Sequence, residues 1–282
     1  MTDNKIRISK RKFKKHLFFL FYCIVALIMI FPMIWAISMS LAGPGQVYAT
    51  PPKFFAPPLR FDNYTAVLEK YDFLKYFGNS LFLCVVEMLG VLISNCMIGF
   101  GFAKYDTMGL NRLFFIGLCT MYIPAISCMV PRYVMWAKVG ALDTYLPLIL
   151  PTFFGAMGWI FMMRQNFKSI SNSFFEAAYI DGANPMYILW RIYVPLSKPI
   201  IANIMLRTFM GAWNNLQNPL IYITTKEKYT VSLALAQLRS DATDHIEHQM
   251  AGTMLVIITV VLVYFIAQKF FVSGDVDAGV KG

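Results

Sequence analysis

An uncharged run of 25 residues, Leu17–Leu41, constrains this chain more than any other feature of its sequence. A helix needs roughly 20 mostly apolar residues to cross the hydrocarbon core of a bilayer, so this run is long enough to span it. Charged residues make up only 14% of the chain, compared with about 25% in soluble domains. Apolar runs at this density need lipid as their solvent, which excludes a soluble domain and a disordered chain. The chain is therefore predicted to be an all-α polytopic membrane protein.

Five further apolar stretches complete a predicted set of six transmembrane helices. They cover Phe77–Ala103, Leu113–Tyr133, Tyr145–Met163, Pro199–Ile223 and Met250–Ala267. The start of the chain resembles a signal peptide, but its apolar run is longer than a usual signal core and no small-residue cleavage pattern follows it. We therefore expect an uncleaved first span and a transmembrane domain over residues 17–268, with both termini on one side of the cell membrane.

The distribution of Lys and Arg predicts which side of the membrane holds the termini. Cytoplasmic flanks carry an excess of these residues, and seven of them lie in residues 1–16. Placing this end inside makes 1–16 a basic cytoplasmic N-terminus and 269–282 a cytoplasmic tail, with 42–75 and 224–249 as extracytoplasmic loops. The net charge of +10 then mainly reports topology, with contact between the basic N-terminus and anionic membrane lipid as the alternative role, and no nucleic-acid partner is expected.

The two extracytoplasmic loops leave their roles open. The first half of 42–75 is rich in proline, which makes it stiff and extended, and Asn63–Lys75 is predicted to form a short amphipathic helix. This loop is either a docking surface or a passive cap on the helix bundle. The second loop contains His245 and His248, with Asp244 and Glu247 beside them. The spacing of the two His residues allows a metal site, but without a third ligand at a familiar spacing we expect solvated loop residues.

The longest cytoplasmic segment, residues 164–198, is predicted to hold two short helices. Ser171, Asn172 and Ser173 offer a cap for the first helix, and Gly182 permits a turn that most residues cannot make. Asn184 caps the second helix, with a proline at the first position, and Pro195 is expected to end it. The second helix is too short to span a membrane and too apolar for water. We predict insertion into a groove on another protein, with an interfacial position on lipid as the alternative.

The same segment carries a longer pattern of fixed spacing. It resembles the signature of inner-membrane permease subunits of ABC importers: Glu-Ala-Ala, three residues, Gly, nine residues, Ile, one residue, then Leu-Pro. The one departure is Val194 in place of Leu. The resemblance implies that the helix–turn–helix over residues 176–195 couples the chain to an ATPase, with Glu176 and Asp181 as the polar contacts. Its matching residues are Glu176, Ala177, Ala178, Asp181, Gly182, Ile192 and Pro195.

Other stretches are similar to the carbohydrate branch of these permeases, the maltose-transporter-like second permease family. They are Asp181-Gly182-Ala183, Trp213-Asn214 followed by Pro219-Leu220, Gly140 to Tyr145, and the final Ala278 to Gly282. The resemblance implies the ABC type I importer permease fold and a heteromeric complex. Its members would be a second permease subunit, an ATPase subunit dimer, an extracytoplasmic sugar-binding protein and a carbohydrate substrate. By the same analogy, the 224–249 loop reaches into the binding protein and the tail touches the ATPases.

The sequence itself places ATP elsewhere in such a complex. No G-x-x-x-x-G-K-[ST] phosphate loop occurs in the chain, so it lacks this device for cradling ATP phosphates. We expect ATP and Mg to bind partner subunits, and no cofactor to bind this chain. The chain is then a non-catalytic transport subunit.

The predicted fifth span carries a stripe of polar residues. Intramembrane polar groups are costly and are functional candidates by default. The stripe follows helical spacing, and Trp213 beside it offers an aromatic surface suited to sugars: Asn203, Arg207, Gly211, Asn214 and Asn218. It lines either the translocation path or a hydrogen-bonded seam with the second permease. Glu87 in the second span pairs with Arg207, stays protonated or lines the path.

Two other classes of protein fit the sequence less well than an importer subunit does. A proton-coupled secondary transporter of a small polar solute, acting alone, would need more intramembrane acids than Glu87, and no inverted repeat is visible. An intramembrane enzyme ranks last because the spans contain no Ser/His pair, paired Asp or H-E-x-x-H motif.

Overall fold

The computed structural model describes residues 2–51, 53–241 and 245–278, and this part of the chain consists of helices and connecting turns without a strand. The all-α prediction is therefore confirmed. The chain divides into two compact units. The first comprises residues 1–71 and 238–255, and the second comprises the remainder.

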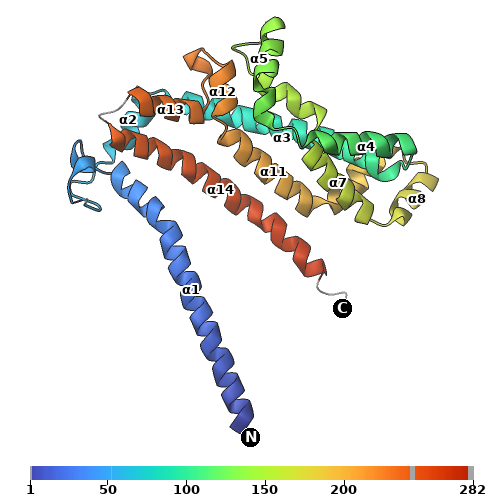
Figure 1. The fold of residues 1–282 in the computed structure, drawn as a ribbon, viewed down its shortest axis with the longest axis horizontal. Coiled ribbons are helices and arrows are strands. Elements are labelled where there is room, and N and C mark those ends of the chain that lie inside the picture. Colours follow the sequence, from blue (N-terminus) through green and yellow to red (C-terminus); the bar gives the residue numbers. More distant parts are fainter. Residues whose placement is uncertain (1, 52, 242–244, 279–282) are drawn as a thin grey trace. The chain divides into compact units, whose positions relative to one another are not determined.

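The first unit begins with the long helix α1 (Thr2–Ser40), drawn in blue in Figure 1. Its stretch Lys14–Ser40 is long and apolar enough to cross a membrane, and none of its most apolar window is buried. Large apolar side chains are exposed along the helix from Leu17 to Ile37. A helix that is apolar all round belongs in lipid or in a larger core, which agrees with the first predicted span.

The short helix α2 (Asp62–Lys70) ends five residues before the predicted boundary at Lys75. The chain turns there because Asp72 adopts a left-handed conformation with φ of 49°. At the other end of α2, the side-chain Nδ2 of Asn63 donates to the backbone carbonyls of Ser40 and Ala42 at 2.8 and 2.9 Å. These bonds satisfy carbonyls at the end of α1 that have no partner within the helix.

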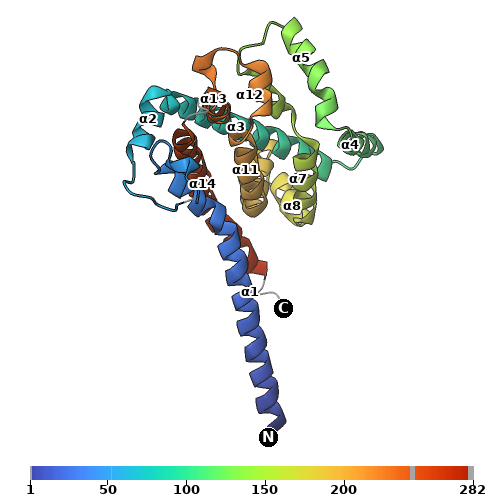
Figure 2. The same ribbon diagram turned by 60° about the vertical axis from the view of Figure 1, so that its left-hand side comes forward.

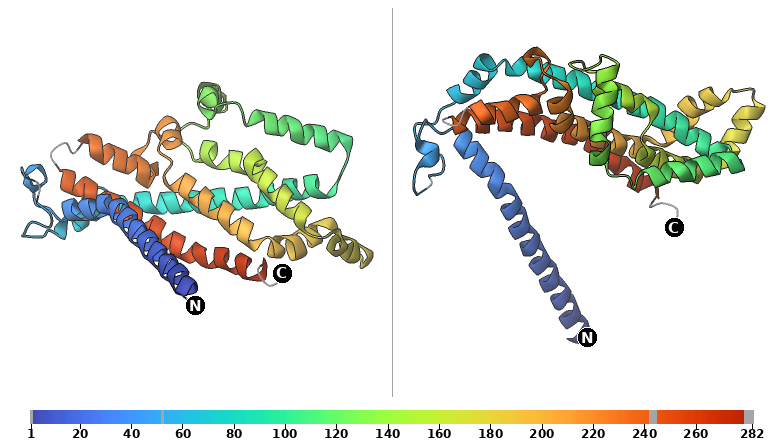
Figure 3. Two further views of the ribbon diagram at one scale, coloured as in Figure 1. Left: turned by 60° about the horizontal axis from the view of Figure 1, so that its bottom comes forward. Right: turned by 45° about the horizontal axis from the view of Figure 1, so that its top comes forward.

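The second unit is organised around α3 (Phe73–Lys104), which packs against α7 (Met157–Ser169) and α11 (Lys198–Trp213). Figures 1 and 3 show both helices alongside α3. The later part of α14 (Ile246–Ala278), from Val256 onward, belongs to the same unit. These apolar helices correspond to the second, part of the fourth, part of the fifth and the sixth predicted spans.

Two of the predicted spans are not single straight helices. The third consists of two helical segments, α4 (Met108–Thr120) and Ala125–Lys138, and the second of these includes α5 (Met129–Lys138). The two segments meet at a bend of 94°, and Figure 2 shows the change of direction. The fourth begins as α6 (Leu146–Ile149) and a 3-10 turn before α7 starts.

The expectation of a continuous fifth span over Pro199–Ile223 is wrong. Helix α11 ends at Trp213 after 16 residues, and α12 (Gln217–Tyr222) follows a break. The side chain of Asn214 donates to the carbonyl of Met210 at 2.8 Å, and Asn215 accepts from the amide of Asn218 at 3.2 Å. Such local bonds compete with helix continuation. Among the described residues, four helices reach spanning length, or five if the bent pair is one span.

The predicted loop 224–249 contains helices. It includes a 3-10 turn (Lys226–Lys228), α13 (Val231–Asp241) and the first residues of α14. The expectation of solvated residues is wrong for Glu247, which is 1% exposed and lies 3.0 Å from the Nδ1 atom of His245. Asp244 lies outside the described residues. Within the described part of the chain, no three His, Cys, Asp or Glu side chains are placed to hold a metal ion.

Candidate coupling segment and transport face

Residues 171–197, here called the coupling segment, begin with the predicted helix and turn. Helix α8 covers Asn172–Ile180, and the hydroxyl of Ser171 accepts from the amide of Ser173 at 3.3 Å. Gly182 follows with φ of 84°, a left-handed conformation that glycine adopts without a steric penalty. The predicted cap and turn are confirmed.

The second helix starts as predicted but does not end where expected. The side chain of Asn184 accepts from the amide of Tyr187 at 2.8 Å at the start of α9 (Pro185–Ile188). The helix then widens into a π turn, Leu189–Tyr193, and continues as α10 (Val194–Leu196). The prediction that Pro195 ends the helix is wrong. Proline lacks an N–H and crowds the carbonyl four residues before it, and a π turn provides a wider path at this point.

The structure divides the predicted coupling residues among three positions. Four of them surround one hollow of about 810 Å³: Ala178, Asp181, Gly182 and Ile192. Glu176 and Ala177 are exposed on α8. Pro195 lies instead at an apolar groove between α3, α11 and α14.

The outer surface of the coupling segment is unusually apolar. The most exposed of its large side chains is Ile180, at 84%, and five others are at least about half exposed: Phe174, Tyr179, Met186, Tyr187 and Leu196. Contiguous exposed apolar side chains mark interaction surfaces. The two helices are too short to span a bilayer. The segment therefore combines an exposed apolar surface with a hollow whose lining includes Asp181, Asn184 and Arg191, an arrangement suited to contact with another protein.

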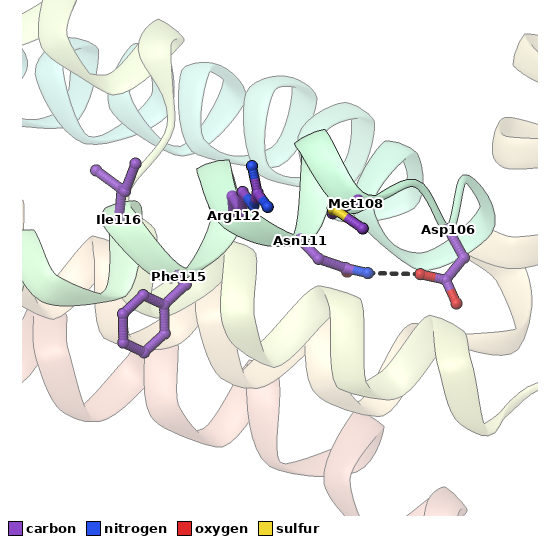
Figure 4. Close-up of a pocket in the computed structure, with 6 residues that line it drawn as sticks. All are labelled: Asp106, Met108, Asn111, Arg112, Phe115 and Ile116. Atoms are coloured by element: carbon purple, nitrogen blue, oxygen red, sulfur yellow. Dashed lines mark hydrogen bonds between the residues drawn. The ribbon is translucent and has the colours of Figure 1, made fainter.

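A second hollow, of about 730 Å³, lies at the start of α4 (Figure 4). Its lining comes from α4 and the residue Asp106 just before it. The side-chain Nδ2 of Asn111 donates to the carboxylate of Asp106 at 2.6 Å, so these two side chains satisfy each other's hydrogen-bonding groups. The hollow is lined only by residues at the start of α4 and just before it, and no other helix contributes a polar group to its lining.

The predicted polar stripe lies on one side of α11 only as far as the helix continues. The Nε of Arg207 donates to the side-chain oxygen of Asn203 at 3.0 Å. Neither residue lines the apolar groove to which the other face of α11 contributes. Gly211 and Asn214 are also exposed. Asn218 lies beyond the break, on α12, so the expected continuation of the stripe to this residue is wrong.

Two further path candidates occupy different surroundings from those expected. Trp213 is 1% exposed, its indole N–H donates to the carbonyl of Val256 at 3.3 Å, and its ring contacts Phe77 and Phe209. Trp213 is thus a packing residue and offers no free aromatic surface. Glu87 is half-buried on α3. The ion pairs among the described side chains do not include a pair between Glu87 and Arg207.

The chain is similar to known membrane transport proteins. A family model described as the inner membrane component of binding-protein-dependent transport systems matches residues 7–274. The chain belongs to this family. It is a multi-pass permease of the cell membrane and a non-catalytic transport component.

Several relatives of the permease are named as sugar transport permeases. The arabinooligosaccharide transport permease AraQ of Bacillus subtilis is 29% identical over 93% of this chain and 94% of its own. The lactose transport permease LacG of Rhizobium radiobacter is 28% identical over 89% and 91%. A chain from the crystal structure of a bacterial ABC transporter that imports the acidic polysaccharide alginate matches with a TM-score of 0.81 at 29% identity, covering 93% of this chain and 98% of that one. The permease therefore has the fold of an ABC importer permease.

One polar cluster of the permease was missed from the sequence. Asp143, with φ of 56°, accepts from the amides of Thr224 and Thr225, each at 2.9 Å, and from Lys228 Nζ at 2.8 Å. The Lys228 ammonium, followed by Thr225, holds the pKa of Asp143 well below its usual range. This cluster fixes the start of the 224–249 region to the turn before α6. Asp143 is 81 or more positions away from each of its partners, so the local spacing of residues gives no indication of the cluster.

Proposed function

We propose that this permease forms half of the translocation pathway of an ATP-driven, binding-protein-dependent carbohydrate importer. The family assignment and the sugar substrates in the names of its relatives support this function. They favour it over a proton-coupled secondary transporter acting alone. The partners are a second permease subunit, an ATPase dimer that binds ATP and Mg, and an extracytoplasmic sugar-binding protein.

The coupling segment is the element proposed to seat in the ATPase. The observation that carries this role is the apolar helix–turn–helix surface around the 810 Å³ hollow, with Asp181 on its rim and Glu176 exposed nearby. A nucleotide-driven partner needs a rigid protrusion to move, and the capped α8, the Gly182 turn and the π turn provide one. Both termini are proposed to lie on the same, cytoplasmic side as this segment.

Substitution of Gly182 tests the coupling role. A Cβ at Gly182 or at Gly140 would meet no atom within 4 Å, and both glycines have positive φ, 84° and 67°. Valine at either position therefore introduces backbone strain of about 1–2 kcal/mol without a clash. We expect Gly182→Val to lower sugar uptake and recovery of the ATPase with the complex. Gly140→Val is the matched control and should leave ATPase recovery unchanged.

An asparagine variant separates strain from loss of a contact. Asparagine tolerates the left-handed conformation, so Gly182→Asn should retain more ATPase binding than Gly182→Val. Wild-type uptake with an intact complex in Gly182→Val would refute the coupling assignment.

The polar face of α11 is proposed to line the translocation path. Asn203, Arg207 and Asn214 point away from the apolar groove of their own chain, and such a face in a membrane must meet water or a polar partner. Asn214→Ala should lower uptake or change sugar preference while the complex still assembles. Met205→Leu, on the groove face of the same helix, serves as the control. Wild-type uptake and preference in Asn214→Ala would leave only a packing role for this residue.

A further inference from the structure

Lys104, the last residue of α3, reaches into the coupling segment. Its Nζ atom donates to the side-chain oxygen of Asn172 at 2.8 Å and lies 4.5 Å from the ring centroid of Tyr193 and 5.8 Å from that of Phe175. One cation thus contacts α8 through two residues and the π turn through a third. Cation–π contacts of this kind contribute about 0.5–2 kcal/mol.

An aromatic cluster beneath Lys104 joins the same elements. Phe100, one turn earlier on α3, lies 5.2 Å from Tyr193, 6.0 Å from Phe167 of α7 and 6.2 Å from Phe175 of α8, measured between ring centroids. Phe167 and Tyr193 are fully buried. Close-packed interiors have low compressibility and transmit displacement. A shift of the coupling segment is therefore passed to α3 at this point.

Lys104 adds direction to this contact. The packed rings transmit movement that presses the coupling segment against α3, but they resist sliding of α8 and the π turn over Phe100 less well, because apolar packing is non-directional. A hydrogen bond from an ammonium is charge-assisted and about twice as strong as a neutral one. Since Lys104 holds Asn172 and the Tyr193 face together, a pull on either part of the segment reaches the end of α3.

We propose that Lys104 is a positioning residue that transmits movement of the coupling segment to α3 during transport. This inference rests on the proposed coupling function. Helix α3 packs on both α7 and α11, so its displacement reaches the helix that carries the polar transport face. Lys104 itself contacts neither sugar nor nucleotide in this scheme.

Three variants in the complete importer, reconstituted in vesicles with its binding protein, test the inference. Lys104→Met keeps the apolar stem but removes the ammonium, and Lys104→Arg keeps the charge. Lys168→Met is the matched control, because Lys168 is exposed on the last turn of α7. The measurements are sugar transported per ATP hydrolysed, recovery of the ATPase with the complex, and photo-cross-linking to the ATPase from p-benzoylphenylalanine placed at position Ile180.

The expected result is uncoupling without disassembly. Lys104→Met should lower sugar transported per ATP by roughly tenfold, which corresponds to about 1.4 kcal/mol, while the ATPase is recovered and still cross-links. Lys104→Arg should restore most of the ratio, and Lys168→Met should match wild type.

The contrary outcomes separate this inference from the proposed function. A wild-type transport ratio in Lys104→Met with the cross-link present overturns the role of Lys104 and leaves the coupling segment assigned. Loss of the ATPase from Lys104→Met reduces Lys104 to a structural contact and also overturns the inference. Absence of the cross-link in the otherwise wild-type chain overturns the proposed function and this inference with it.

Discussion

The contact between α3 and α7 predicts opposite effects for two glycines two positions apart. A Cβ added at Gly99 would lie 2.8 Å from the Cβ of Met163, 3.3 Å from the amide nitrogen of Arg164 and 3.4 Å from the carbonyl oxygen of Ile160. A Cβ added at Gly101 would meet no atom within 4 Å. The pair Gly99→Ala and Gly101→Ala therefore adds the same methyl group to the same helix in two different environments.

The magnitude follows from what blocks the methyl group. A Cβ atom and two backbone atoms cannot rotate away, so relief at Gly99 requires α3 and α7 to separate by several tenths of an ångström. Overpacking of this kind costs about 1–3 kcal/mol. The gain in helix propensity from Gly to Ala, about 1 kcal/mol, is common to both variants and cancels in their difference. We expect Gly99→Ala to be less stable than Gly101→Ala by about 1–3 kcal/mol.

Unfolding of the purified complex in detergent, followed by helical circular dichroism over a denaturant titration, measures this difference. Transport should follow stability, because α7 leads directly into the coupling segment. Equal unfolding midpoints for the two variants, or a less stable Gly101→Ala, would show that α3 and α7 do not approach as closely as the structure has them. The reasoning from the Gly99 contact would then be wrong.

Three further predictions concern single polar groups. Because the Lys228 ammonium lowers the pKa of Asp143, this carboxylate stabilises the fold above about pH 4 and loses that contribution on further acidification. The difference in unfolding temperature between wild type and Asp143→Asn should therefore be constant above about pH 4 and narrow below it. A difference that widens in acid contradicts the assignment. Asn95, 1% exposed, accepts from the amide of Ala156 at 2.9 Å, so Asn95→Ala should destabilise by about 1–3 kcal/mol in the same titration, with exposed Ser169→Ala unchanged. The buried hydroxyl of Tyr193 has no hydrogen-bond partner among the described residues, so Tyr193→Phe should be neutral or stabilising by up to about 1 kcal/mol, and a clear loss of stability would reveal a partner.

Turn and cap chemistry of the coupling segment was predictable from the sequence because it acts over a few residues. Ser171 and Asn184 accept from amides two and three positions later, and the positive φ of Gly182 is a property of one residue. The apolar runs likewise predict spanning helices wherever no local competitor interrupts them. In the fifth span Asn214 and Asn215 are such competitors, and hydropathy alone does not register their bonds to the backbone.

Contacts between distant residues were not predictable in the same way. Lys104 and Asn172 are 68 positions apart, and neither residue stands out by type or spacing. Asp143 was noticed only as part of a family resemblance, although its carboxylate organises the residues around Thr225. Such pairs depend on how helices pack, and packing is set by many small contacts rather than by a local pattern.

Two contacts between distant residues lie near opposite ends of one helix, α3. Near the start of α3, Asn79 donates to the carbonyls of Glu227 and Tyr229 at 2.9 and 3.0 Å, in the region predicted to face the binding protein. At its end, Lys104 holds the coupling segment. The helix has 32 residues, or about 48 Å at 1.5 Å per residue, which is enough to cross a bilayer. Because a continuous helix resists compression along its axis, α3 provides a direct mechanical path between the two surfaces at which the permease is proposed to meet its soluble partners.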